Sequence, residues 1–167
     1  MSDLYKEHLV KKKQTAADSM TRVLLIGGTA LLGLAGILIY PIFLLGALAM
    51  GICAYIFLPG TDLEYEYLLV NRSLDIDKVM AKTKRKRVRS FDLSGVDIIA
   101  PLKSHRLDYY NQNPNIKVLD YSSGIDEHKR FAFIISEEGN LSKVIFEPDE
   151  EMASLLRQSM PSKVFLD

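Results

Sequence analysis

The sequence predicts a membrane helical hairpin followed by a mainly-β domain of about seven strands with a C-terminal helix. Three observations lead to this fold class. Residues 23–58 contain no charged side chain, residues 63–146 are divided into short aromatic and branched segments, and an apolar stripe of helical period begins at Met152. We expect three regions: a cytoplasmic N-terminal helix over 1–22, the hairpin over 23–58, and a cytoplasmic domain over 61–167.

The apolar stretch 23–58 is too long for one membrane span. As a straight helix it would extend about 54 Å, whereas the hydrocarbon core of a bilayer is about 30 Å thick. Pro41 lies near its middle, and proline is tolerated at the start of a helix but not in its interior. We therefore expect two spans, 23–40 and 41–58, which fold back on each other.

Two other interpretations of this stretch are weaker. A cleaved signal peptide would have an apolar region of about 7–15 residues, which is much shorter than this one. A buried hairpin in a soluble protein would need a polar shell around both helices, and a chain of 167 residues has little protein to supply it.

Basic residues flank the hairpin on both sides. Lys11–Lys13 and Arg22 precede it, and the segment Lys82–Arg89 follows it with six basic residues and no acidic one. Because basic flanks stay on the cytoplasmic side, we expect a multi-pass protein of the cell membrane with both termini in the cytoplasm. The spans contain no Asp, Glu, Lys, Arg or His, and ion and proton pathways normally need such groups, so a transporter is disfavoured.

Small residues recur four positions apart within each span. The pairs are Thr29 with Gly33, and Ala47 with Gly51. Small residues at this spacing let helix backbones approach closely in lipid. Packing within the hairpin and contact with a second copy are both compatible with the pattern, as is the general abundance of Gly in membrane helices.

The segment before the hairpin has a weak helical stripe formed by Tyr5, Leu9, Ala16 and Met20. We expect residues 3–20 to form an amphipathic helix. Such a helix would either lie on the inner membrane surface beside Lys11–Lys13 or lead into the first span as a solvated helix.

Seven segments after the hairpin have the composition of strands, at 63–70, 74–79, 85–93, 96–100, 116–121, 130–136 and 141–146. A polar loop over 103–115 separates the fourth strand from the fifth. The acidic residues 149–151 favour a helix start, and Met152, Leu155, Leu156 and Met160 then form an apolar stripe. The short apolar tail at Val164 and Phe165 is expected to pack back on the sheet.

Three segments carry a resemblance to a known group of proteins: YEYLLVNRSLDID, RSFDLSGVDII and KVIFEPDEEMASLLRQSMPSKVF. They resemble bacterial PH-like domains that are attached to short membrane hairpins. Over residues 20–165 the chain is similar to an uncharacterised family of small two-span membrane proteins from Gram-positive anaerobes. The resemblance implies a partly open barrel with a capping C-terminal helix, and it implies no activity, catalytic residue or cofactor.

The strongest candidate site outside the spans is a basic run on the third expected strand. It consists of Lys82, Lys84, Arg85, Lys86, Arg87 and Arg89. On a strand, Arg85, Arg87 and Arg89 share one face, and Lys84 and Lys86 share the other. Juxtamembrane basic residues contribute about 1 kcal/mol each at an anionic membrane surface, so the run predicts contact with anionic lipid head groups.

Two other roles compete with lipid contact for the basic run. A solvated edge strand gains from such charges, because they discourage pairing with other chains. Nucleic acid is disfavoured, because no aromatic side chain interleaves with the charges to stack on bases.

No constellation in the sequence indicates catalysis or a cofactor. His8, His105 and His128 are far apart and lack the spacing of metal ligands, and no serine lies in a nucleophile motif. We therefore expect a non-catalytic, membrane-anchored binding or scaffolding module at the inner face of the cytoplasmic membrane. The alternative is an accessory subunit of a larger membrane complex, which meets an unknown membrane protein or a second copy through the hairpin.

Overall fold

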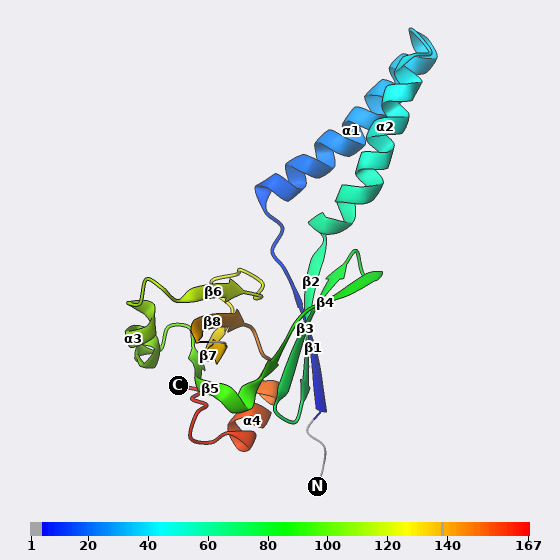
Figure 1. Ribbon diagram of the computed structural model, residues 1–167. Coiled ribbons are helices and arrows are strands. Elements are labelled where there is room, and N and C mark those ends of the chain that lie inside the picture. Colours follow the sequence, from blue (N-terminus) through cyan, green and yellow to red (C-terminus); the bar gives the residue numbers. More distant parts are fainter. Residues whose placement is uncertain (1–4, 138) are drawn as a thin grey trace. The chain divides into compact units, whose positions relative to one another are not determined.

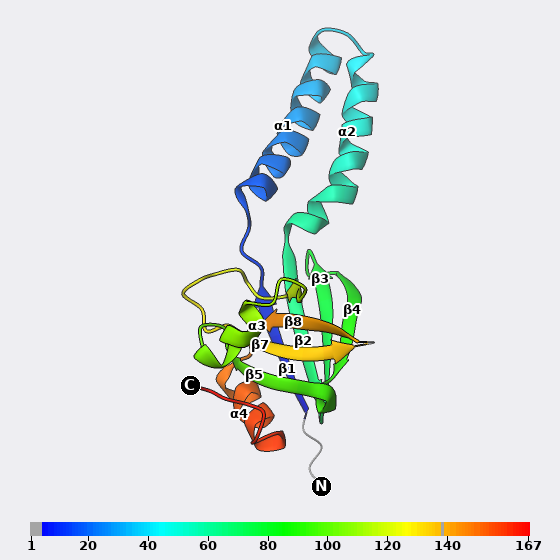
Figure 2. The same cartoon turned by 60° about the vertical axis from the view of Figure 1, so that its left-hand side comes forward.

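The computed structural model describes residues 5–137 and 139–167. The chain divides into two compact units. One comprises the described part of Met1–Lys12 together with Glu64–Val79 and Arg85–Asp167, and the other comprises Lys13–Leu63 and Met80–Lys84. The first unit contains two sheets and the C-terminal helix, and the second contains a pair of long helices (Figures 1 and 2).

The long helices are α1 (Ala16–Leu38) and α2 (Phe43–Phe57), and a 3-10 turn over Leu58–Thr61 extends the second. Helix α1 begins earlier than expected because Thr15 and Asp18 form a capping box at its start. Pro41 lies in the connection, where its carbonyl accepts from Leu44 N–H at 3.0 Å. The two expected apolar helices are present, and Pro41 lies in the connection between them, two residues before α2.

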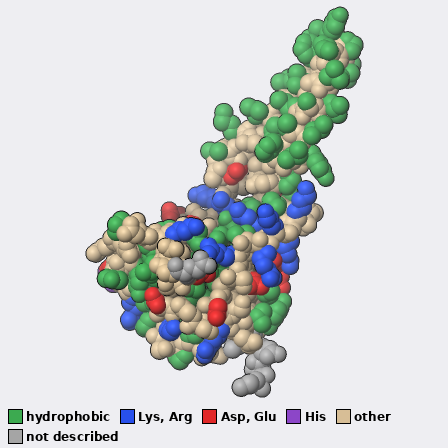
Figure 3. Space-filling view, in the orientation of Figure 1, with side chains coloured by type: hydrophobic (Ala, Val, Ile, Leu, Met, Phe, Trp, Pro, Cys, Tyr) green, Lys and Arg blue, Asp and Glu red, His purple; other side chains and the backbone are tan. Residues whose placement is uncertain are grey.

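Both helices are long and apolar enough to cross a membrane. The candidate spans Ala16–Leu38 and Phe43–Thr61 have mean hydropathies of 1.8 and 2.0, and only 6% of each is buried. On the face shown in Figure 3, most of their coloured side chains are hydrophobic. Soluble proteins rarely expose apolar surface of this extent, which argues against the buried-hairpin interpretation.

The N-terminal segment forms a strand, so the helix expected for residues 1–22 is wrong over this part. Strand β1 (Tyr5–Lys11) pairs antiparallel with β2 (Leu63–Val70), from Tyr5↔Val70 to Lys11↔Glu64; residues 1–4 lie outside the described residues. The period-four spacing of Tyr5 and Leu9 also fits one face of a strand, and the partner strand is remote in sequence. The two helices are therefore inserted between two paired strands.

The first sheet continues with β3 (Ser73–Met80) and β4 (Lys84–Asp92), in the order β1-β2-β3-β4. The second sheet has the order β5-β7-β8-β6, with β5 at Val96–Pro101, β6 at Lys117–Asp120, β7 at Phe131–Glu137 and β8 at Asn140–Phe146. All seven expected strands are present, and β1 is the eighth. In the described part of the chain they form two four-stranded sheets and no closed barrel.

Aromatic side chains join the inner faces of the two sheets. The ring centroids of Phe91 and Phe133 are 5.1 Å apart, and those of Tyr67 and Phe146 are 6.0 Å apart, both edge to face. Residues 102–116 cover the other face of the second sheet, where Leu107 is buried against Ala132 and Ile134. This segment, expected as a loop, contains a 3-10 turn (His105–Leu107) and the short helix α3 (Asp108–Asn111).

Helix α4 (Glu150–Ser159) begins at Asp149, whose side chain accepts from Met152 N–H. Met152, Leu156 and Met160 are buried, whereas Leu155 is half-buried. The expected C-terminal helix and its apolar stripe are confirmed. The tail also packs as expected, because Val164 is buried and bridges to Ile99.

Candidate functional site

The three arginines of the basic run are ion-paired in the first unit. Arg85 contacts Glu66 at 2.7 Å, and Arg87 contacts Asp75 at 3.0 Å and Asp77 at 3.5 Å. Arg89 contacts Glu137 at 2.6 Å. Most of their positive charge is therefore balanced within the domain.

Strand alternation places these acids. Tyr65 and Tyr67 of β2 point into the core, so Glu66 between them lies on the outer face of the sheet, and the same reasoning applies to Asp75 and Asp77 on β3. Cross-strand pairs of opposite charge stabilise such a face. The acidic positions were visible in the sequence, but their pairing partners were not.

Arg89 departs from the predicted arrangement of the run. Its guanidinium lies over the Phe91 ring, 5.5 Å from the centroid, and contacts Glu137 of the second sheet. The expectation that Arg85, Arg87 and Arg89 share one face is therefore wrong for Arg89. The contacts indicate an irregularity in β4 between Arg87 and Phe91, which strict alternation cannot anticipate.

Glu66 is the most perturbed acid on this face. Its side chain is 3% exposed, and burial, together with a hydrogen bond to Glu7, raises the pKa of Glu66 to about 7 against the opposing effect of Arg85. The same hydrogen bond lowers the pKa of Glu7. The two carboxyl groups, on adjacent strands β1 and β2, therefore share one proton up to near neutral pH.

The lysines of the run differ from the arginines. Lys82, Lys84 and Lys86 are exposed, and among the residues that the structure describes no carboxylate pairs with them. Lys82 lies at the tip of the turn between β3 and β4, where Ala81 and Lys82 have φ values of 48° and 57°. Such a turn strongly favours Asn-Gly, so a lysine is retained here at a conformational cost.

This turn belongs to the same compact unit as the long helices. Ala81 N–H donates to the Asp62 carbonyl at 2.8 Å, and Lys84 Nζ lies 5.5 Å from the centroid of the Tyr55 ring on α2. The unpaired charges of Lys82 and Lys84 are therefore held where the second long helix ends.

The residues predicted to pack the helices have different environments. A Cβ added to Gly51 would lie 3.8 Å from Thr29 Cγ2, so these two positions face each other. Ala47 is half-buried, whereas a Cβ at Gly33 would meet nothing within 4 Å. Thr29 and Gly51 thus face each other within the hairpin, and Gly33 has open space beside it.

Two glycines that the spacing rule missed make closer contacts. A Cβ at Gly36 would come within 2.7 Å of the Leu44 side chain, and one at Gly28 within 2.5 Å of Met50 Sδ. At Gly36 only glycine fits, because a Cβ would also lie 2.9 Å from the backbone N of Leu44, whereas at Gly28 the flexible end of Met50 could shift. Their partners lie on the other helix, so spacing within a single span could not identify them.

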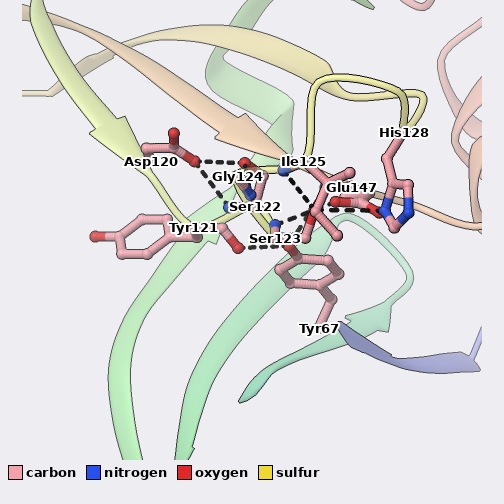
Figure 4. A network of polar contacts seen from close by, with 9 residues as sticks. All are labelled: Tyr67, Asp120, Tyr121, Ser122, Ser123, Gly124, Ile125, His128 and Glu147. Atoms are coloured by element: carbon pink, nitrogen blue, oxygen red, sulfur yellow. Dashed lines mark hydrogen bonds and ion pairs between the residues drawn. The ribbon is translucent and has the colours of Figure 1, made fainter. Parts of the chain in front are cut away.

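Figure 4 shows a polar network at the ends of β6 and β8. Glu147 accepts from Ser123 N–H at 3.1 Å and lies 2.5 Å from His128 Nδ1. Ser123 Oγ also lies 3.4 Å from His128 Nδ1, whereas in a Ser-His-acid triad the serine and the acid use different ring nitrogens. Ser123 is buried at 1% exposure, so the network fixes the 122–128 turn.

Tyr67 anchors this network to the first sheet. Its hydroxyl donates to the Tyr121 carbonyl at 2.6 Å and accepts from Glu147 N–H at 3.3 Å. Burial raises the pKa of Tyr67, so the phenol stays protonated and keeps donating. These contacts tie the two sheets together.

A cavity of about 540 Å³ lies beside this network, lined by His8, Phe131, Pro148, Asp149 and other residues. His8 Nδ1 is 3.6 Å from an Asp149 carboxylate oxygen, and Lys6 contacts Asp149 at 3.2 Å. The sequence did not indicate this cavity, because its β1 residues were expected in a helix.

In the described ranges 5–137 and 139–167, no group of three or more His, Cys, Asp or Glu side chains could hold a metal ion.

One comparison with known proteins gives a match. The family model described as a bacterial PH-like domain (DUF6106) matches residues 2–166, which is nearly the whole chain and includes both long helices. Comparisons with curated proteins and with solved structures gave no match. The match agrees with the resemblance carried by the strand and helix segments. The chain therefore belongs to the bacterial PH-like domain family DUF6106.

Proposed function

We propose that this protein is a non-catalytic binding or scaffolding module, anchored by its two long helices at the inner face of the cytoplasmic membrane. A PH-like domain suggests a binding or scaffolding role. The observation that carries the anchoring is the exposure of the helices, since only 6% of each candidate span is buried although both are strongly apolar. Lipid would supply the cover that the protein does not.

The pairing of β1 with β2 supports the proposed topology. The chain leaves the domain after Lys11 and re-enters it at Glu64, and these two residues face each other in the ladder. Both flanks of the inserted helices must therefore lie on the same side of a membrane. Basic flanks favour the cytoplasmic side, so the proposed topology has both termini in the cytoplasm.

Protease protection of intact cells tests this arrangement. We expect epitope tags at either terminus to survive external protease until the cells are lysed, and the protein to sediment with membranes after a carbonate wash. A variant with residues 13–63 removed provides the control, because it should move to the soluble fraction. Loss of either tag in intact cells would contradict the proposed orientation.

The lysines Lys82, Lys84 and Lys86 are the proposed contact with anionic lipid head groups. In the described ranges no carboxylate pairs with these three lysines. The arginines of the basic run are paired with acids, so we restrict the proposed lipid contact to the lysines. At about 1 kcal/mol for each lysine, the three together would strengthen binding to an anionic surface about 100-fold.

A soluble form of the domain allows this contact to be measured. Because Lys11 and Glu64 form the last pair of the β1–β2 ladder, an Asn-Gly turn can join them in place of residues 12–63; we call this protein the closed domain. It should bind vesicles of phosphatidylglycerol and phosphatidylcholine, and release them as salt screens the charges. Changing the three lysines to Gln should weaken binding, whereas the charge-matched changes Lys103→Gln, Lys117→Gln and Lys129→Gln should not. Equal binding to purely neutral vesicles would contradict the proposal.

A role as an accessory subunit of a membrane complex remains the alternative, and one observation favours it. A Cβ at Gly33 on α1 would meet nothing within 4 Å, so another helix could approach closely there. A Gly33→Leu variant that loses a partner seen with the detergent-solubilised wild type would support this alternative. Unchanged co-purification would leave the lipid-contact role as the better account.

A further inference from the structure

Helices α1 and α2 are tightly packed at one end and separate at the other. Near the connecting turn, Gly36 allows α1 to contact Leu44. Further from that turn, Thr29 on α1 faces Gly51 on α2. Toward the N-terminus of α1 and the C-terminus of α2 the helices diverge (Figures 1 and 2). No pair of small residues brings the helices together at that end.

The divergence leaves an apolar groove of about 420 Å³. It is lined by Ala17, Met20, Thr21, Leu24 and Leu25 of α1 and by Phe57 of α2. The one hydroxyl in this set is already used, because Thr21 Oγ1 donates to the Ala17 carbonyl at 2.9 Å. The groove therefore offers no polar partner, and an occupant must present hydrocarbon to it.

Cationic groups of the same compact unit lie near the ends of the helices that form this groove. Arg22 follows Thr21 in sequence, and its Nε donates to Thr61 Oγ1 at 2.7 Å at the end of the 3-10 turn. Lys84 lies over Tyr55, two residues before Phe57. In the described part of the chain no carboxylate pairs with Arg22 or Lys84.

We propose that the groove holds one acyl chain of an anionic glycerophospholipid, with its phosphate near Arg22, Lys82 and Lys84. This inference rests on the proposed membrane anchoring and adds a specific site to it. The occupant follows from complementarity: hydrocarbon fits the apolar lining, and the adjacent positive charges favour an anionic head group. A protein helix in the groove would leave these charges without partners.

The absence of tryptophan from the sequence allows a direct test. Single-Trp variants of the full-length protein are reconstituted in bilayers, and their fluorescence is quenched by lipids with brominated acyl chains. Phe57→Trp reports on the groove, and Met20→Trp reports on it from α1. Ile56→Trp is the matched control, because Ile56 is next in sequence and exposed but does not line the groove.

We expect brominated phosphatidylglycerol to quench Phe57→Trp and Met20→Trp with an apparent affinity about 30-fold higher than that of brominated phosphatidylcholine. Two unpaired basic groups at an anionic head group give a preference of this size. Ile56→Trp should show no such preference. Adding Lys82→Gln and Lys84→Gln should remove the preference at Phe57→Trp while leaving quenching by phosphatidylcholine unchanged.

Two results would overturn the inference while leaving membrane anchoring intact. One is the same lipid ratio at Phe57→Trp and Ile56→Trp, which indicates unselective surrounding lipid. The other is that brominated lipids quench Ile56→Trp but do not quench Phe57→Trp. This result would indicate that the groove is closed or filled by protein. Absence of quenching at Ile56→Trp would instead refute the anchoring, and the inference with it.

Discussion

Strand β1 should be an essential part of the PH-like domain, although the two long helices separate it in sequence from the rest. The perturbation is deletion of residues 1–11 from the closed domain, which leaves a domain that starts at Glu64. The comparison isolates β1, because both proteins lack the helices.

The expected loss can be worked out from the contacts of β1. Val10 is 6% exposed, and burying such a side chain contributes about 1.5–3 kcal/mol. The contacts of Lys6 and His8 with Asp149 are open to solvent and add little to this loss. The ladder hydrogen bonds and the entropy of ordering the strand are of similar size and opposite sign. The net loss is therefore about 2–3 kcal/mol, mainly from Val10, and this is a substantial part of the 5–15 kcal/mol typical of a domain.

Urea unfolding followed by far-UV circular dichroism measures this loss. With a denaturant dependence of about 1–3 kcal/mol per molar urea, the unfolding midpoint should fall by about 1 M. Val10→Ala in the closed domain should give a smaller shift in the same direction. Equal midpoints for the closed domain and the deletion, or failure of the closed domain to fold, would refute the reasoning that β1 completes the domain.

Three further predictions concern single residues. In the closed domain, Leu156→Ala should reduce the free energy of unfolding by about 2–5 kcal/mol, whereas the exposed Gln158→Ala should change it little; equal effects in urea would contradict the capping role of α4. Because the pKa of Glu66 is raised to about 7 when folded, its contribution to stability is full at low pH and is lost as the pH rises through about 7. Glu66→Gln should therefore flatten the decline in unfolding free energy between about pH 5 and pH 8, and an unchanged pH profile would argue against the raised pKa. In detergent, Gly36→Val should destabilise the helical pair by about 1–3 kcal/mol and Gly33→Val should not, as measured by thermal loss of helical circular dichroism; the reverse order would contradict the observed packing.

Features of the chain with a local physical cause were predictable. The lack of charge over residues 23–58 requires helices that avoid water, and Pro41 interrupts them because its ring does not fit a helix interior. Strand β2 was expected at 63–70, where the structure has it. Helix α4 was recognised because its stripe and its acidic first turn are properties of neighbouring residues.

The sequence-based predictions were wrong where the local structure depends on residues that are distant in the chain. The spacing of Tyr5 and Leu9 fits a helix or a strand, and the choice depends on hydrogen bonds to β2 across the inserted helices. The basic run looked uniform in sequence. Only the neighbouring strands show that Arg85, Arg87 and Arg89 are paired and that the lysines are not.

The sequence by itself thus determined that this protein has two apolar helices, a mainly-β domain and an amphipathic C-terminal helix, because periodicity, composition and turn residues act over short distances. Tertiary structure alone decided that β1 belongs to the domain, that α1 approaches α2 closely at Gly36, and that Arg22 and Lys84 contact residues near the end of the second long helix. These features depend on side chains from distant segments, and their energies exist only once the chain has folded.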